Sequence, residues 1–214
     1  MPRNKDLKRL ARARMAETGE RYTQALTHIL RQPELEPLSA AWVMTGSHAP
    51  DYEAGLLPES ITYDGSRVVR LRLRTADAEP LGFGALMQCI AATRYLGRRV
   101  RFSAMARAQE ITGWAGLWLR IDGPGGQLVL DNMQDRPLRQ VTGWTKAEIV
   151  LDVPEQAAVL NFGALLSGAG ALDLTGLRFE EAAADVAVTA APHMASPLPD
   201  EPQGLDFVRH PDLS

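Results

Sequence analysis

The chain has 214 residues, of which 45% are hydrophobic and 23% are charged, and its net charge is −3. This length suits one domain of ordinary size with short appendages. The small net charge does not indicate a polyanionic partner for the chain as a whole. The single cysteine, Cys89, excludes an intramolecular disulfide framework, and the apolar run ALMQCIAA around it predicts a buried small side chain and not a nucleophile.

The first 33 residues predict a hairpin of two short helices. Leu7, Leu10 and Met15 recur at helical spacing, Gly19 suits a helix C-terminal cap, and Pro33 ends the second helix. Two short helices with narrow apolar stripes cannot form their own core. We therefore expect them to pack on the rest of the chain or on a second copy, which would make a homodimer.

The predicted hairpin is also rich in basic side chains. Such charge attracts nucleic-acid phosphates, so DNA binding is one hypothesis and a solvated, dimer-forming hairpin is the other. The basic residues that would contact DNA are Lys5, Lys8, Arg9 and Arg12. The same charges stand where a signal peptide would need an apolar region, and no run approaches the roughly 20 apolar residues of a membrane span. The sequence thus predicts a cytoplasmic protein without a membrane segment.

Residues 41–182 alternate between apolar and polar side chains with a period of two. In RVVRLRLRT, Leu71 and Leu73 fall on one face and Arg70 and Arg72 on the other. Short strands at regular spacing, with turn residues between them, predict a mainly β fold, an antiparallel β-sandwich of jelly-roll type. Residues 183–214, rich in Pro and Ala, predict a tail. The predicted strands are AWVMTGS, SITYDG, RVVRLRLRT, GALMQCIAA, RRVRFSAMAR, GLWLRID, TKAEIVLDV, AVLNFGALLSG and GALDLTGLRFEEA.

Several of these segments resemble the carbohydrate-binding-module type of galactose-binding-like jelly roll. The segments that carry the resemblance are YLGRRVRFSA at 95–104, Gly143-Trp144, VLDVPE at 150–155, FGALLSG at 162–168 and LDLTGLRFE at 172–180. In the last of them Thr175 and Gly176 stand where the family has paired aspartates, so the resemblance implies no calcium site here. The segment DNMQDRP is similar to one in an uncharacterised bacterial group, sometimes met in proteins named as transcriptional regulators.

A ligand-binding face is the hypothesis that follows from this fold. The residues opposite the core mix an aromatic ring with guanidinium and amide groups, which suits a sugar or an anionic ligand. The alternative is a solvated sheet face with cross-strand ion pairs. The residues placed opposite the core are Gln88, Arg70, Arg72, Arg101, Met105, Trp118, Arg120, Glu148 and Asn161. The predicted ligand contacts are Trp114, Trp118, Arg120, Asn132, Gln134, Arg72 and Asn161.

The loop DNMQDRP, which follows the short strand at 128–130, needs its own explanation. Asp131 and Asn132 suit a turn in which side chains accept backbone hydrogen bonds. A pair between Arg136 and either Asp131 or Asp135 would stiffen the loop. For the aspartates we favour stiffening, and for Asn132 and Gln134 we favour contact with a ligand.

Catalysis is poorly supported by the sequence. The histidines, His28, His48, His193 and His210, are scattered and show no metal-ligand spacing. We therefore predict no catalytic residue, no metal and no cofactor. The predicted function is a non-enzymatic small-molecule or carbohydrate-binding sensor, as part of a transcriptional regulator. The alternatives are a DNA-binding regulator that uses the basic helices and a glycan hydrolase that uses Asp131 and Asp135.

Overall fold

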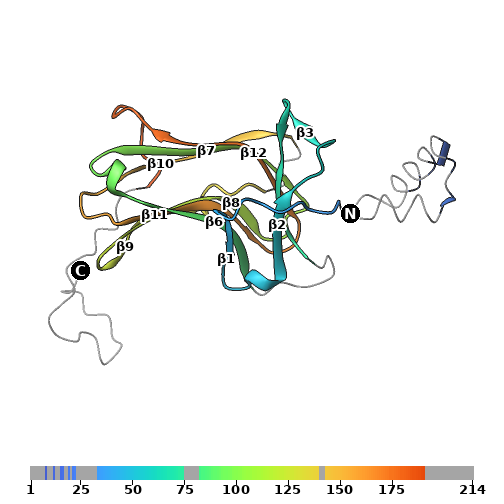
Figure 1. Cartoon of the computed structure of the whole chain (residues 1–214), viewed down its shortest axis with the longest axis horizontal. Helices are drawn as coiled ribbons and strands as arrows, with labels where there is room; N and C mark the ends of the chain where they lie inside the picture. The colour runs from blue at the N-terminus through green and yellow to red at the C-terminus, as the bar shows by residue number, and fades with distance from the viewer. Residues whose placement is uncertain are drawn as a thin grey trace, which may run out of the picture.

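The computed structural model describes residues 33–74, 82–139 and 143–190, together with seven isolated positions before Pro33. The described ranges form an antiparallel β-sandwich, as predicted. Figure 1 shows its two layers edge-on, with β7, β10 and β12 in one layer and β6, β8 and β11 in the other.

The first layer, sheet A, has five strands in the order β10-β7-β12-β5-β2. Its strands are β2 (Tyr52–Leu56), β5 (Val69–Leu73), β7 (Arg99–Gln109), β10 (Thr145–Asp152) and β12 (Ala171–Glu181). The second layer, sheet B, has the order β1-β6-β11-β8-β9. Its strands are β1 (Val43–Thr45), β6 (Phe83–Ala91), β8 (Trp114–Gly123), β9 (Gly126–Asp131) and β11 (Val159–Ser167).

Three small elements complete the described structure. The hairpin of β3 (Thr62–Tyr63) and β4 (Ser66–Arg67) forms a separate two-stranded sheet. Thr175 Oγ1 donates a hydrogen bond of 2.8 Å to the Arg67 carbonyl and ties this hairpin to β12. Two 3₁₀ turns, η1 (Ala49–Asp51) and η2 (Thr93–Tyr95), lie in connections.

The core lies between the sheets, where the inward side chains of both layers meet. Phe162 of β11 contacts Phe179 of β12 with ring centroids 4.7 Å apart, and Phe102 of β7 lies 5.1 Å from Phe162. Leu117, Leu119 and the other inward residues of β8 are fully buried. Each such side chain contributes about 1.5–3 kcal/mol by leaving water, so this layer of apolar contacts is the main source of stability.

The predicted alternation of faces is confirmed in β5, β7 and β8. Leu71 and Phe102 point into the core, while Arg70 and Arg101 point away from it. The sequence missed β2, because YEAGL lacks a clear period-two pattern of apolar side chains. The segment GPGG at 123–126 forms the turn between β8 and β9.

The single cysteine differs from its expected position. Cys89 is exposed, and the prediction that it is buried is wrong. It lies on the outward side of β6, and the apolar run around it is apolar on both faces of the strand.

The predicted hairpin over 1–33 falls outside the described residues except at isolated positions, and no α-helix is among the elements of the described ranges. Residues 191–214 of the predicted tail also lie outside them.

Candidate functional site

The outward face of sheet A carries a row of polar side chains across the edge strand β10 and its neighbours β7 and β12. The strand register places Glu148 of β10 beside Ser103 of β7, and Ser103 beside Arg178 of β12. The next row along β7 contains Lys146, Met105 and Thr175. Because paired residues in a sheet point to the same side, these side chains stand next to one another on one surface.

A β-bulge and the β3–β4 hairpin turn this surface into a groove. The register of β12 shifts between Thr175 and Arg178, and Gly176 has φ +60°, so the strand bends there. The resulting hollow has a volume of about 480 Å³. Its lining residues are Tyr63, Asp64, Ser66, Arg101, Ser103, Ala104, Met105, Lys146, Thr175, Gly176, Arg178 and Glu180. We call this hollow the sheet A groove.

The groove and its border contain both paired and unpaired polar groups. Glu148, which borders the groove, is held by Lys146 at 2.7 Å and lies 3.4 Å from Arg101, and both of these partners line the groove. The hydrogen bond from Lys146 lowers the pKa of Glu148 below its ordinary value, so this carboxylate is ionised at neutral pH. Arg178 is exposed and has no ion-pair partner in the part of the chain that the structure describes. Its guanidinium is therefore free to bind a ligand in the groove.

Ser103 supplies a further free group, at the centre of the floor. Only 6% of this residue is exposed, and within the described ranges its hydroxyl has no hydrogen-bond partner. A hydroxyl can donate one hydrogen bond and accept two. Ser103 therefore offers a bound ligand a polar contact between the carboxylate of Glu148 and the guanidinium of Arg178.

Aromatic rings stack beside the groove. The ring of Tyr63, on the hairpin, lies 4.6 Å from that of Trp144, and the Arg107 guanidinium lies 5.0 Å from the Trp144 ring centroid. Arg107 in turn binds Asp173 at 2.7 Å, and Arg70 binds the same carboxylate at 2.6 Å. These contacts connect Tyr63 of the hairpin through Trp144 and Arg107 to Asp173 of β12. Because Asp173 is fully buried, the contacts fix the hairpin to sheet A.

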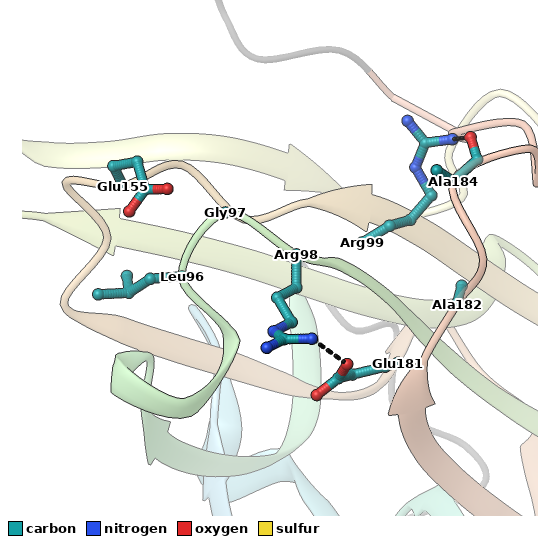
Figure 2. Close-up of a pocket in the computed structure, with 8 residues that line it drawn as sticks. All are labelled: Leu96, Gly97, Arg98, Arg99, Glu155, Glu181, Ala182 and Ala184. Atoms are coloured by element: carbon teal, nitrogen blue, oxygen red, sulfur yellow. Dashed lines mark hydrogen bonds and ion pairs between the residues drawn. The ribbon is translucent and has the colours of Figure 1, made fainter.

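A second hollow, of about 410 Å³, lies where β7 begins (Figure 2). Its polar groups are largely occupied by one another. Arg98 pairs with Glu181 at 3.0 Å, as Figure 2 shows, and Arg99 donates to the Ala184 carbonyl at 2.6 Å. Arg99 also forms a two-pronged pair with Asp152, whose pKa is lowered by these hydrogen bonds. These arginines hold the segment after β12 in place and leave fewer free groups than the sheet A groove.

The predicted ligand contacts do not share one surface, which corrects the expected single groove. Arg72 lies on the outward face of sheet A, whereas Trp118, Arg120 and Asn161 lie on the outward face of sheet B. The two faces are on opposite sides of the sandwich. The period-two pattern gives the face of each strand correctly, but it does not reveal which sheet a strand joins.

Most of the predicted contacts are already engaged within the protein. Arg72 binds Glu53 at 2.7 Å and the Pro33 carbonyl at 3.0 Å. Arg120 and Asn161 both bind Asp122, at 2.9 and 2.8 Å. Trp118 is 7% exposed and packs with Ala85, Leu165 and the half-buried Trp114, so its ring is not an open stacking platform.

The DNMQDRP loop closes an edge of the sandwich. Asp131, at the end of β9, accepts a hydrogen bond from the Met133 amide at 2.9 Å and pairs with Arg136 at 2.6 Å. Burial alone would raise the pKa of Asp131, but hydrogen bonds from Arg136, Thr189 and the Met133 amide outweigh it and lower the pKa. Arg136 also reaches the Glu148 carbonyl of sheet A at 3.5 Å. We call Asp131 and Arg136 the edge clasp.

The stiffening that we expected for the aspartates is therefore present in the structure. Asp131 is paired and buried, so it is not the free carboxylate that the hydrolase hypothesis needs. Asn132 accepts a hydrogen bond from the Gln134 amide at 3.1 Å, which forms a second turn, and Met133 has φ +57°. Ligand contact by Asn132 and Gln134 stays a prediction.

The outward-face analysis of the sequence included two residues that line the groove, Arg101 and Met105, and Glu148 at its border. It left out Tyr63, Lys146 and Arg178. The period-two pattern of RRVRFSAMAR places Ser103 on the same side as Arg101, but Ser103 was not selected as a site residue. Arg178 alternates with core residues on its strand, so periodicity could have placed it outward as well. Tyr63 joins the site only because the hairpin folds over sheet A, and no local signal in the sequence predicts this.

The fold and the site together define an antiparallel β-sandwich with a polar groove on one outer face. No protein-family model matches the chain. A Bacillus subtilis (strain 168) protein named "Uncharacterized HTH-type transcriptional regulator YbfP" is 35% identical over 175 residues, which cover 81% of this chain and 58% of that protein. The chain thus spans little more than half the length of this relative.

The similar solved structures include carbohydrate-binding modules. A xylan-binding domain of family 22 has a TM-score of 0.48 and 17% identity, with 72% of this chain and 93% of that domain covered. The family 22 xylan-binding domain of Paenibacillus barcinonensis Xyn10C has a TM-score of 0.46 and 15% identity, with coverage of 68% and 88%. These likenesses concern the fold alone. Both resemblances read from the sequence, to such modules and to a protein named as a regulator, recur here.

Proposed function

We propose that this protein is a non-enzymatic binding protein whose sheet A groove holds a neutral, polyhydroxylated ligand of the sugar class. The observation that carries the proposal is the row formed by Glu148, Ser103 and Arg178, of which Ser103 and Arg178 line the groove and Glu148 borders it. It places an acceptor, a hydroxyl and a guanidinium donor side by side. Such a set can bind adjacent hydroxyl groups of one sugar ring, which donate and accept hydrogen bonds in turn.

The charge of the groove favours a neutral ligand over an anionic one. Three cationic residues, Arg101, Lys146 and Arg178, line the groove together with Asp64 and Glu180. The carboxylate of Glu148, which pairs with Lys146 and Arg101 at the border of the groove, balances the third positive charge. A polyanion would meet three carboxylates, and like charges brought together oppose binding. Met105 on the floor and Tyr63 on the wall offer apolar surface to the CH groups of a sugar.

Trp144, stacked on Tyr63, is a natural reporter of binding. We expect titration of the full chain with neutral xylo- and galacto-oligosaccharides to change its tryptophan fluorescence. Arg178→Ala should weaken binding by at least about tenfold, since a hydrogen bond to a charged group contributes about 1.5–3 kcal/mol. Arg94→Ala is the matched control, because Arg94 is also exposed but lies outside the groove.

An unchanged affinity for Arg178→Ala would contradict the assignment of the groove. The absence of a response to every neutral oligosaccharide, with a response to sugar acids or sugar phosphates, would overturn the choice of ligand class. Glu148→Gln separates the two cases further. Glutamine keeps the length and shape of the glutamate side chain but removes its charge, so this variant should bind neutral ligands more weakly and anionic ligands more tightly.

A second candidate role, that of the sensor part of a cytoplasmic transcriptional regulator, is favoured by the relative named as one. In this proposal the basic residues Lys5, Lys8, Arg9 and Arg12 contact DNA phosphates. A mobility shift on duplex DNA should then weaken steeply with salt. Replacing these four residues by alanine should abolish the shift, while Arg94→Ala with Arg139→Ala should leave most of it. An equal mobility shift in both variants would contradict DNA binding through these four N-terminal residues.

A further inference from the structure

Arg101 differs from the other arginines of β5 and β7 in how it is bound. Its guanidinium lies 3.4 Å from the carboxylate of Glu148 and 3.5 Å from that of Glu180. Hydrogen bonds between a guanidinium and a carboxylate are normally about 2.7–2.9 Å long. Arg101 therefore lies between two carboxylates without a firm bond to either. The other four arginines of these strands bind a carboxylate at 2.6 or 2.7 Å, and their pairs are Arg70–Asp173, Arg72–Glu53, Arg99–Asp152 and Arg107–Asp173.

Much of the hydrogen-bonding capacity of Arg101 is unused within the described part of the chain. An arginine has five N–H donors. In Arg101, Nε is buried and has no hydrogen-bond partner there, and the contact from Nη1 to Glu180, at 3.5 Å, is at the outer limit for a hydrogen bond. Buried donors in folded proteins are nearly always paired, so an unpaired one calls for an explanation. Because Arg101 lines the sheet A groove and 25% of its side chain is exposed, a ligand in the groove can reach its other N–H groups.

The groups next to Arg101 define what such a ligand must offer. Ser103 comes two residues later on β7, so its side chain points to the same side of the sheet. It lines the groove, and its hydroxyl has no partner within the described ranges. Glu148 on β10 and Glu180 on β12 flank Arg101. The position thus combines a fork of donors with a free hydroxyl and an acceptor on each side.

Two kinds of ligand group match the fork of a guanidinium. A carboxylate places two oxygens side by side, and so do two hydroxyl groups on adjacent carbons, which together form a vicinal diol. A carboxylate on Arg101 would lie between Glu148 and Glu180, and like charges brought together oppose binding. The hydroxyls of a diol can accept hydrogen bonds from Arg101 and donate hydrogen bonds to the two carboxylates. The flanking residues therefore select the diol.

We propose that Arg101, Ser103, Glu148 and Glu180 form a binding position for a vicinal diol of the ligand. This inference rests on the proposed function of the sheet A groove and narrows the class of its ligand. The ligand must carry two hydroxyls on adjacent ring carbons, and a polyhydroxylated molecule without such a pair is rejected. Arg101 is the residue that determines this specificity, since its fork contacts both hydroxyls.

The unsubstituted full chain tests this proposal with methyl β-xyloside and methyl β-galactoside as probes, in titrations followed by NMR. We expect at least one of the two to bind. Its 3-deoxy derivative, in which no two adjacent ring carbons carry hydroxyls, should bind at least about tenfold more weakly, because hydrogen bonds to charged groups are lost. The 2-deoxy and 4-deoxy derivatives are the matched controls. Each keeps one vicinal diol, so at least one of them should retain most of the affinity and thereby identify the diol that binds.

Arg101→Lys tests the role of the fork, because lysine keeps the positive charge but replaces the planar fork by a single ammonium group. It should weaken binding of the parent sugar by about tenfold and change binding of the 3-deoxy derivative little, since the two changes remove the same interaction. Arg98→Lys is the matched control. Arg98 pairs with Glu181 and lies outside the sheet A groove, so this variant should bind like the unsubstituted chain.

The outcomes separate this inference from the proposed function. A 3-deoxy derivative that binds as tightly as its parent, or an unchanged affinity of Arg101→Lys for the parent, would overturn the diol position, while a loss on Arg178→Ala would still support the groove. A chain that binds neither methyl glycoside nor any oligosaccharide would overturn the proposed function, and this inference with it. The comparison of deoxy derivatives decides the matter even if Arg101→Lys fails to fold.

Discussion

The two outer faces of the sandwich differ sharply in chemistry. The outer face of sheet A is covered by arginines and carboxylates that pair across strands, and it carries the groove. The outer face of sheet B has two charged residues, already paired with each other, and exposes Val43, Phe83 and Leu130. The comparison teaches that the two outer faces of one β-sandwich can differ in kind, one polar and hollowed and the other apolar with its few charges paired.

The largest expected effect concerns the buried charge on sheet A. Asp173 is fully buried and binds Arg70 and Arg107. Asp173→Asn leaves two cations facing a neutral amide, and we expect a loss of about 4 kcal/mol in the free energy of unfolding. Urea denaturation measures it. Asp152→Asn, which breaks the more exposed pair with Arg99, should cost about 1 kcal/mol or less. Equal losses would mean that burial does not distinguish the two pairs.

On sheet B the corresponding effect comes from apolar packing. Trp118→Ala should lower the stability by about 3 kcal/mol, because a large buried ring leaves a cavity when it is removed. Trp114→Ala should cost clearly less, since Trp114 is only half-buried. Thermal unfolding of both variants tests this prediction. A larger loss of stability for Trp114→Ala than for Trp118→Ala would contradict the conclusion that Trp118 is the more buried of the two rings.

The edge clasp, which joins the two sheets, predicts a dependence on pH. The pKa of Asp131 is lower in the folded protein than its unfolded value of about 3.9. Its contribution is therefore complete above about pH 5 and is lost as the pH falls through 4 toward the folded pKa. Asp131→Asn should cost about 2 kcal/mol at pH 7 and progressively less toward pH 3. A cost that does not change with pH would rule out the ionised clasp.

The smallest expected effect on stability is in the groove. Arg178 is exposed and unpaired within the described ranges, so Arg178→Ala should change the free energy of unfolding by less than about 0.5 kcal/mol. The same substitution should weaken ligand binding, so the effect of Arg178 on binding can be measured separately from its effect on stability. A substantial loss of stability would indicate that Arg178 has a structural role.

Much of the fold could be predicted from the alternation of apolar and polar residues, because an inward side chain must be apolar wherever a strand borders the core. The alternation failed where both faces are apolar, as around Cys89. The edge clasp was partly predictable, since Asp131 and Arg136 are close in the sequence. The burial of Asp173 was not, because Arg70 and Arg107 come from strands distant in sequence.

The sequence by itself determined that this chain forms an antiparallel sandwich and which side chains point away from the core. Only the tertiary structure decided which of those side chains meet. Successive strands from β5 to β8 alternate between the two sheets, so outward residues of β7 and β8 lie on opposite sides of the molecule. For that reason Ser103 shares a groove with Arg178 and Tyr63, while Trp118 is packed into the other face.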